Sequence, residues 1–310
     1  MRVFVTGATG FIGSALVREL LDAGHQVLGL TRSDAGARSL AAAGAQVHRG
    51  SLEQPETLRS GAAQSDGVIH LAFDHSAFGQ DFSKFIEVCE NDKRAIQAMG
   101  DALAGSDRPL LITSGTGMGN AAPGQPATED HFDPNHPNPR KASEVAGAAA
   151  AARGVNVSVV RLPQVHDTVK QGLVTYAVQL AREKGVSAYI GEGLNRWPAA
   201  HVLDVAYLYR LALEKHEAGA RYNAVAEEGV PMREIAEVIG KRLKVPAVSL
   251  SPGDAQAHFG WLAMFAGYDM PASSAQTRQE LGWRPTGPGM LADLEQMNYF
   301  PDAALADSAR

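Results

Sequence analysis

The first thirteen residues constrain the fold of this chain more than any other stretch. A short β-rich run at residues 2–5 leads into the sequence TGATGFIG at residues 6–13. A helical pattern follows at once, because apolar residues recur roughly three and four positions apart, at Ile12, Ala15, Leu16, Leu20 and Leu21. Strand, glycine loop and helix in this order is the context in which a glycine motif predicts a dinucleotide phosphate site.

Each glycine of this loop has its own expected role. Gly7 permits the tight turn, Gly10 lets the backbone approach a pyrophosphate, and Gly13 lets the helix pack on the strand. The free N–H groups and partial positive charge of the helix N-terminus favour the phosphates. We therefore expect the loop to contact a dinucleotide cofactor through Gly7, Thr9, Gly10, Phe11, Ile12 and Gly13.

Composition argues against several other classes of protein. A net charge of −6 without a long basic run argues against nucleic-acid binding. No apolar run is long enough to span a membrane, and residues 1–5 carry no signal-peptide pattern. Cys89 is the only cysteine, so we expect no disulfide framework and a reducing cytoplasm as the location. The 10 histidines include no His-x-x-x-His pair, and we expect no metal site.

The residues after the second expected strand, 25–30, bear on the choice of cofactor. A sheet that binds NAD usually offers an acidic residue here to hold the ribose 2′-hydroxyl. This chain has Arg32 and Ser33 instead, and Asp34 lies later than that position. A guanidinium and a hydroxyl suit a 2′-phosphate, so the sequence favours NADP(H) over NAD(H). The alternative is an arginine that is simply solvated after the strand.

Strands and helices continue to alternate as far as residue 162. Further strands are expected at 46–48, 67–72, 109–113 and 157–162, with helices at 82–103 and 139–152. This alternation predicts an α/β fold with a doubly wound parallel sheet, the Rossmann fold. We expect Ser51 and Leu52 where an adenine ring would lie, and Leu71 and Ala72 at a strand end beside the cofactor. Residues 119–139 are expected to form a loop.

The pattern changes beyond residue 165, which divides the chain into two regions. Residues 1–165 are the expected NADP-binding domain. Residues 166–300 are a smaller substrate-binding region, of which about 200–226 returns to the first domain, and 301–310 are an expected frayed tail. Four aromatic residues either line a substrate pocket or form ordinary core, and the sequence leaves both readings open: Phe259, Trp261, Phe265 and Tyr268.

Several motifs together resemble the extended short-chain dehydrogenase/reductases, the NAD(P)-dependent epimerase/dehydratase group. They cover nearly the whole chain: TGATGFIG, Leu71 and Ala72, Ser114 after strand five, RLP at 161–163, HVLDVA at 201–206 and LGWRP at 281–285. The resemblance implies a Rossmann domain that binds NAD(P), with Ser114 as the catalytic serine. It also implies that Pro163 and Val165, in and after the turn that follows strand six, contact the cofactor.

One segment departs from the family pattern. The family's acid is a tyrosine in Tyr-x-x-x-Lys, with an acidic residue four positions after the lysine. Alignment of Glu144 on that acidic residue places His136 at the tyrosine and Arg140 at the lysine. Because no tyrosine precedes Tyr176, the chain resembles an atypical subgroup with His-x-x-x-Arg in place of Tyr-x-x-x-Lys.

The replacement residues can support carbonyl reduction. A histidine can give a proton to a forming alkoxide near neutral pH, which makes His136 a candidate acid. Arg140 can hold the ribose hydroxyls and keep the site positive, although it cannot exchange a proton. Ser114 can donate a hydrogen bond to the substrate oxygen.

Two prolines complicate the role of His136. Pro137 and Pro139 favour extended backbone at the residues before them, which makes Asn138 the expected N-cap of the next helix. His136 then lies outside the helix, and an exposed loop histidine is the alternative to a catalytic one.

The sequence as a whole predicts an NADP(H)-dependent oxidoreductase that reduces a ketone or aldehyde of a small organic molecule, or oxidises the alcohol. The first alternative is a nucleotide-sugar epimerase or dehydratase, which needs clustered Arg or Lys; here Arg182, Lys184, Arg196 and Arg210 are scattered among acids. The second is a non-enzymatic NADP(H) sensor that has lost the acid. The expected partner is a small carbonyl or alcohol substrate, with no nucleic acid or membrane, and a homodimer is left open.

Overall fold

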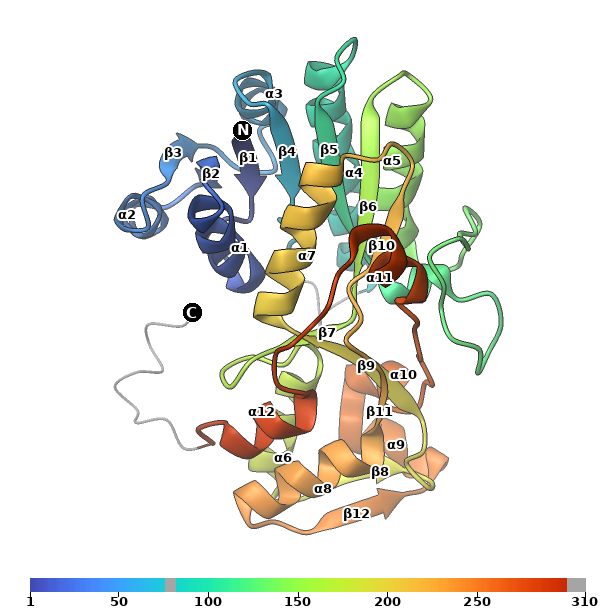
Figure 1. Cartoon of the computed structure of the whole chain (residues 1–310). Helices are drawn as coiled ribbons and strands as arrows, with labels where there is room; N and C mark the ends of the chain where they lie inside the picture. Colours follow the sequence, from blue (N-terminus) through green and yellow to red (C-terminus); the bar gives the residue numbers. More distant parts are fainter. Residues whose placement is uncertain (76–81, 300–310) are drawn as a thin grey trace.

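A large parallel sheet forms the upper part of the molecule in Figure 1. A computed structural model describes residues 1–75 and 82–299, so the expected tail at 301–310 lies outside the described residues. Within these ranges the sheet has 7 strands, in the order β10 (Arg221–Asn223), β6 (Asn156–Leu162), β5 (Pro109–Gly115), β4 (Gly67–His70), β1 (Arg2–Thr6), β2 (Gln26–Thr31) and β3 (Gln46–Arg49). Every pairing is parallel. The prediction of a doubly wound sheet is confirmed.

Helices cover both faces of this sheet, because successive residues of a strand point to opposite sides. Val3 and Val5 of β1 pack with α1 (Phe11–Asp22) and α7 (Val202–Lys215). Phe4 packs on the other face, where the helices are α3 (Pro55–Ala63), α4 (Phe82–Leu103) and α5 (Ala142–Ala151). The shorter α2 (Asp34–Ala42) lies beside β2 and β3. The bounds of α4 are those that the sequence predicted.

A second region lies below the sheet in Figure 1, at the carboxyl ends of its strands. The chain enters it directly, since β7 (Gln164–His166) follows β6 after Pro163 alone. Two small sheets belong to it: β11 (Glu227–Pro231), β9 (Arg196–His201) and β7 in one, β12 (Ala247–Leu250) and β8 (Ser187–Ile190) in the other. Its helices are α6 (Val174–Lys184), α8 (Met232–Leu243), α9 (Pro252–Phe259), η3 (Gly260–Leu262), α10 (Ala263–Ala266) and α12 (Met290–Gln296). They share a second apolar core.

The LGWRP motif ties the end of the chain to the large sheet. It follows α11 (Ala275–Leu281), and the fully buried Trp283 donates its indole N–H to the backbone oxygen of Asp204, at 3.0 Å. The Asp204 carboxylate accepts the N–H groups of Thr286 and Gly287, both at 2.9 Å. His201 caps α7 by accepting the Leu203 N–H. The HVLDVA motif therefore makes structural contacts.

No helix in the two described ranges combines the length and apolar character that a bilayer crossing requires.

Candidate active site

Two glycines of the loop at residues 6–13 are required by the protein itself. Gly7 has a φ of +68°, and a Cβ atom there would lie 2.8 Å from the Ala72 backbone nitrogen. A Cβ atom at Gly13 would lie 1.9 Å from the Gly7 oxygen, because α1 packs closely on the loop. Any side chain at either position would force the backbone to move.

Gly10 has a different environment. Its backbone is extended, at φ −79° and ψ 179°, and a Cβ atom there would meet only the Gly7 oxygen, at 3.2 Å, among the described atoms within 4 Å. No side chain caps α1 at this end, and its first turn contains no acidic residue. The uncapped N–H groups and the open space at Gly10 fit the pyrophosphate of a dinucleotide.

The end of β2 presents a basic group to solvent. Arg32 is exposed and forms no ion pair with any described residue. Ser33 caps α2, its Oγ accepting the Gly36 N–H at 3.0 Å, and Asp34 is paired with Arg49. Asp34 thus forms an exposed ion pair, whereas Arg32 has no such partner at the N-terminus of α2.

The remaining expected cofactor residues follow the carboxyl ends of β3, β4 and β6. Ser51 and Leu52 follow β3 and are partly buried. The N–H of Ala72, beside the partly buried Leu71, donates to Thr6 Oγ1 at 3.2 Å. Val165 is 5% exposed and belongs to the core of the large sheet, so only its backbone can reach a ligand. These contacts stay predictions.

Ser114 lies at the carboxyl end of β5, and the side chain is 3% exposed. Its Oγ has no hydrogen-bond partner among the described residues. Buried hydroxyl groups are rarely left without a partner, because water has been removed from them without replacement. The unpaired Oγ leaves Ser114 able to bind a ligand oxygen, and it shares the lack of a partner with other buried groups, among them the hydroxyls of Tyr222 and Tyr299.

Arg140 is held by two side chains, from α4 and α5, and by a backbone oxygen of β5. It lies in η2 (Pro139–Lys141), which Asn138 caps as predicted, its side chain accepting the Arg140 N–H. The guanidinium donates to Asp92 Oδ2 and to the Thr113 oxygen, both at 2.9 Å, and to Ser143 Oγ. The ring of Phe73 lies 4.0 Å from its Cζ.

Asp92 connects Arg140 to the glycine loop. This carboxylate, 2% exposed within α4, accepts a hydrogen bond from His70 Nε2 at 3.0 Å, and His70 Nδ1 lies 2.7 Å from Thr6 Oγ1. Burial alone would raise the pKa of Asp92, but Arg140, His70 and Ser143 together lower it. The carboxylate is thus ionised beside Arg140. Asp92 therefore pairs with the charge of Arg140, and the expectation that Arg140 keeps the site positive stays a prediction.

His136 lies outside η2, as its flanking prolines predicted, and is partly buried. Its Nδ1 accepts the Asn138 N–H at 3.1 Å. A nitrogen that accepts a hydrogen bond carries no proton, so the neutral ring holds its proton on Nε2 in this arrangement.

The alignment that places His136 and Arg140 depends on Glu144, and in the structure Glu144 forms a buried ion pair. Glu144 is buried and forms two hydrogen bonds with the fully buried Arg161, at 2.8 and 2.9 Å. Arg161 also donates to the backbone oxygens of Thr128 and His131. This pair fixes α5 against β6 and fastens the loop that leads to His136.

The sequence pattern of the NAD dependent epimerase/dehydratase family matches residues 3–225. The chain belongs to this family. It is an NAD(P)-dependent enzyme of the short-chain dehydrogenase/reductase type that acts on CH–OH groups. Family membership agrees with the glycine loop and with Ser114 at the end of β5.

Three similar proteins illustrate the range of the family. An uncharacterized protein of Schizosaccharomyces pombe is 49% identical over 97% of this chain and 100% of its own length. A 2-alkyl-3-oxoalkanoate reductase of Stenotrophomonas maltophilia is 28% identical, over 80% of this chain and 77% of that protein. The structure of a UDP-glucose 4-epimerase of Thermus thermophilus with NAD superposes with a TM-score of 0.72, at 22% identity, covering 98% and 100% of the two chains. Reductases and epimerases of the family thus share this fold.

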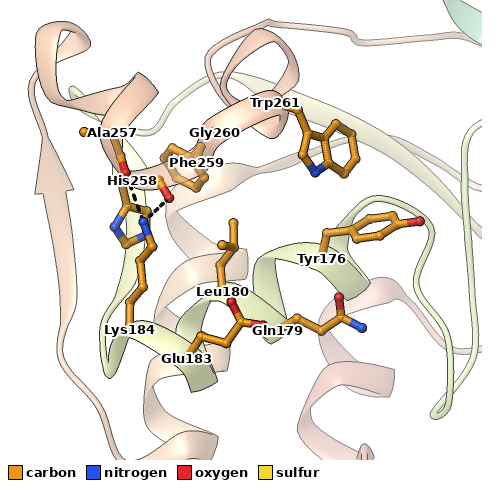
Figure 2. Close-up of a pocket in the computed structure, with 10 residues that line it drawn as sticks. All are labelled: Tyr176, Gln179, Leu180, Glu183, Lys184, Ala257, His258, Phe259, Gly260 and Trp261. Carbon is orange, nitrogen blue, oxygen red and sulfur yellow. Dashed lines mark hydrogen bonds between the residues drawn. The ribbon is translucent and has the colours of Figure 1, made fainter. Parts of the chain in front are cut away.

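A cavity of about 320 Å³ lies in the second region, between α6 and the α9–η3 segment. Figure 2 shows Tyr176 and Trp261 at one end of it, with Leu180 and Phe259 between them and Lys184. The Lys184 ammonium donates to the backbone oxygens of Ala257 and His258. Of the four aromatic residues left open by the sequence, Phe259 and Trp261 line this cavity, Phe265 packs against Trp261, and Tyr268 is 48% exposed.

Sequence reasoning missed Asp92 and His70. The signal was present for Asp92, because it interrupts the apolar stripe of α4 formed by Cys89, Ile96 and Met99. A charged residue on the buried face of a helix needs a partner, which here is Arg140. His70 carries no comparable signal, since a histidine at a strand end has many uses.

Proposed function

We propose that the protein is an NADP(H)-dependent reductase of a small ketone or aldehyde, or runs the reverse oxidation. The unpaired Oγ of Ser114 carries this proposal. A buried polar group without a partner costs on the order of 1–3 kcal/mol, and a carbonyl oxygen at Ser114 removes that cost. Among the relatives, the Stenotrophomonas maltophilia protein is named for the reduction of a ketone.

The chain's own residues bind the substrate oxygen and move the proton. Bound NADPH supplies the hydride to the carbonyl carbon. Ser114 donates a hydrogen bond to the carbonyl oxygen and stabilises the negative charge that develops on it. His136 is the proposed proton donor, in its doubly protonated form. That form requires the hydrogen bond between Nδ1 and the Asn138 N–H to break, because both nitrogens then carry protons.

The preference for NADP(H) rests on the end of β2. Arg32 has no ion-pair partner among the described residues and can meet a 2′-phosphate, while Asp34, which lies later than the usual acidic position, pairs with Arg49 at the surface. The hydroxyl of Ser33 keeps its own proton to donate, since its oxygen is the acceptor in the α2 cap.

An epimerase or dehydratase acting on nucleotide sugars is the second candidate, because family relatives catalyse such reactions. The partners that four of the chain's cations already have argue against this epimerase or dehydratase. Arg196 is paired with Asp269 through two nitrogens, and Lys184 is bound to two backbone oxygens. Arg182 donates to the Tyr299 oxygen, and Arg210 pairs with Glu19 and Glu214. A diphosphate that bound to any of these four cations would have to displace its partner.

A carbonyl panel tests the function directly. Purified protein is incubated with NADPH and ketones or aldehydes of small organic molecules, and the loss of NADPH absorbance is followed; UDP-glucose is included and analysed for isomerised product. We expect NADPH oxidation with at least one carbonyl. Isomerisation of UDP-glucose without net NADPH oxidation would establish the epimerase. Tight NADPH binding without turnover of any panel member would favour the sensor.

Location and assembly stay proposals. A reducing cytoplasm is consistent with the buried Cys89 thiol, whose pKa is raised by burial to about 11, so that it resists oxidation. A homodimer is the assembly that sedimentation of the purified protein would test.

A further inference from the structure

We propose that Asp92 is a positioning residue of the cofactor site, which holds Arg140 so that this arginine contributes directed hydrogen bonds instead of net positive charge. The proposal rests on the proposed function only through binding of the cofactor, and not through any carbonyl substrate.

The geometry around the guanidinium supports this role. An arginine side chain has five N–H donors. One Nη1 donor serves Asp92, another serves Ser143, and one Nη2 donor serves the Thr113 oxygen. Two donors, on Nη2 and Nε, remain without an acceptor among the described residues. Because Phe73 covers one face of the guanidinium, these two donors are fixed in direction.

The energetic cost of burying the Asp92–Arg140 ion pair indicates that the pair positions Arg140 and does not mainly stabilise the fold. The Asp92 carboxylate is 2% exposed and the Arg140 side chain 14%. Burying two opposite charges requires both to lose water, and apolar residues of similar size often give equal or greater stability. A buried pair at the edge of a cofactor site is therefore better explained by what its geometry does there.

The same carboxylate also reaches the glycine loop. His70 donates to Asp92 Oδ1, and its other nitrogen contacts Thr6, the last residue of β1. Thr6 Oγ1 in turn accepts a hydrogen bond from the N–H of Ala72. This is the same backbone nitrogen with which a Cβ atom at Gly7 would collide. Asp92 thus lies between the glycine loop at residues 6–13 and Arg140.

Asp92→Asn separates positioning from charge. The amide keeps the size of the carboxylate, but its NH2 group would face either His70 or the pair Arg140 and Ser143, all of which donate to the carboxylate. If Asp92 positions Arg140, NADPH affinity falls about tenfold, the worth of one hydrogen bond to a charged group, and its salt dependence does not steepen. If Arg140 acts through its charge, the variant exposes that charge, so NADPH binds more tightly and with a steeper salt dependence.

The measurement is NADPH fluorescence titration at several salt concentrations without substrate. Asp101→Asn is the matched control, because Asp101 lies on the same helix in a half-exposed pair with Arg153; its affinity should equal that of the wild type. Thermal melting of each variant reports stability separately. A variant that melts lower but binds NADPH as the wild type does would make Asp92 merely structural and overturn the proposal.

Two further variants keep the test decisive. Arg140→Lys keeps the charge but cannot reach Asp92, Ser143 and the Thr113 oxygen together, so it should lose about the same tenfold even if Asp92→Asn does not fold. The double variant Asp92→Asn/Arg140→Ala should bind no more weakly than Arg140→Ala alone, since Asp92 acts through Arg140. Wild-type affinity in Arg140→Lys would refute the proposal. Because no carbonyl is used, failure of the reductase function leaves these results interpretable.

Discussion

The glycine loop at residues 6–13 and the segment at 136–144 are proposed to contribute to one site, and they are held in different ways. The loop is fixed by its own backbone, since Gly7 and Gly13 have no room for a side chain. The segment is fixed by side chains far away in sequence: Asp92 holds Arg140, and Arg161 holds Glu144. The difference teaches that a site made from backbone can be recognised from a local motif, whereas one made from side chains depends on partners that no motif contains.

Gly10→Val tests the backbone half and should have the largest effect. A valine can adopt the extended backbone of Gly10, and its Cβ would lie 3.2 Å from the Gly7 oxygen, so we expect a small backbone adjustment and a folded protein whose side chain occupies the position expected for the pyrophosphate. We expect cofactor affinity to fall about 100-fold or more, measured by NADPH titration. Gly13→Val is the contrasting variant, which should not fold stably. Unchanged affinity in folded Gly10→Val would place the cofactor elsewhere.

His136→Ala tests the side-chain half. If His136 gives the proton, turnover falls roughly 10²- to 10⁴-fold while cofactor affinity is unchanged. His131→Ala is the control, because His131 contacts Arg161 through its backbone oxygen, which the substitution keeps. A near wild-type rate for His136→Ala would mean that the proton comes through Ser114 or water, and that the histidine has no chemical role.

Ser114→Ala should reduce turnover by roughly 10²- to 10³-fold, the usual worth of one hydrogen-bond donor to a developing oxyanion. Since Ser114 Oγ has no partner among the described residues, its removal should not lower the melting temperature. Thr116→Val, in the adjacent η1 (Thr116–Gly119), is the control and should remain active. A fully active Ser114→Ala would remove the observation on which the reductase proposal rests.

These comparisons show how far sequence reasoning reaches. The Rossmann sheet and α4 were predictable because their apolar patterns are long and most consecutive strands of the sheet are also neighbours in space. The strands β8, β9, β11 and β12 were not assigned, since they are short and β11 contains Gly229 and an irregular register. Within the candidate site, the glycines predicted the loop at residues 6–13, and the prolines predicted that His136 lies outside the helix. The pairing of Arg140 with Asp92 could not be predicted, because the two residues lie 48 positions apart in the sequence.

Arg32→Ala should have the smallest of these effects and gives the most direct reading of cofactor choice. Loss of a charge-assisted contact to the 2′-phosphate is worth on the order of 1.5–3 kcal/mol, so most of the preference for NADPH over NADH should disappear. NADH affinity should not change, because that cofactor has no group for Arg32 to bind. Arg38→Ala, an exposed arginine of the same α2, controls for the general loss of positive charge.

Any preference for NADPH that remains in Arg32→Ala would come from the protein backbone and not from this side chain. The N-terminus of α2 presents backbone N–H groups beside Arg32, and a 2′-phosphate can bind them without any side chain. If Arg32 carries the selectivity, NADPH and NADH bind the variant almost equally in parallel titrations. A preference of several-fold that remains after Arg32→Ala would assign the rest to the helix backbone. Equal affinities in the wild type would refute NADP(H) selectivity at this position altogether, and with it the argument from the pairing of Asp34 with Arg49.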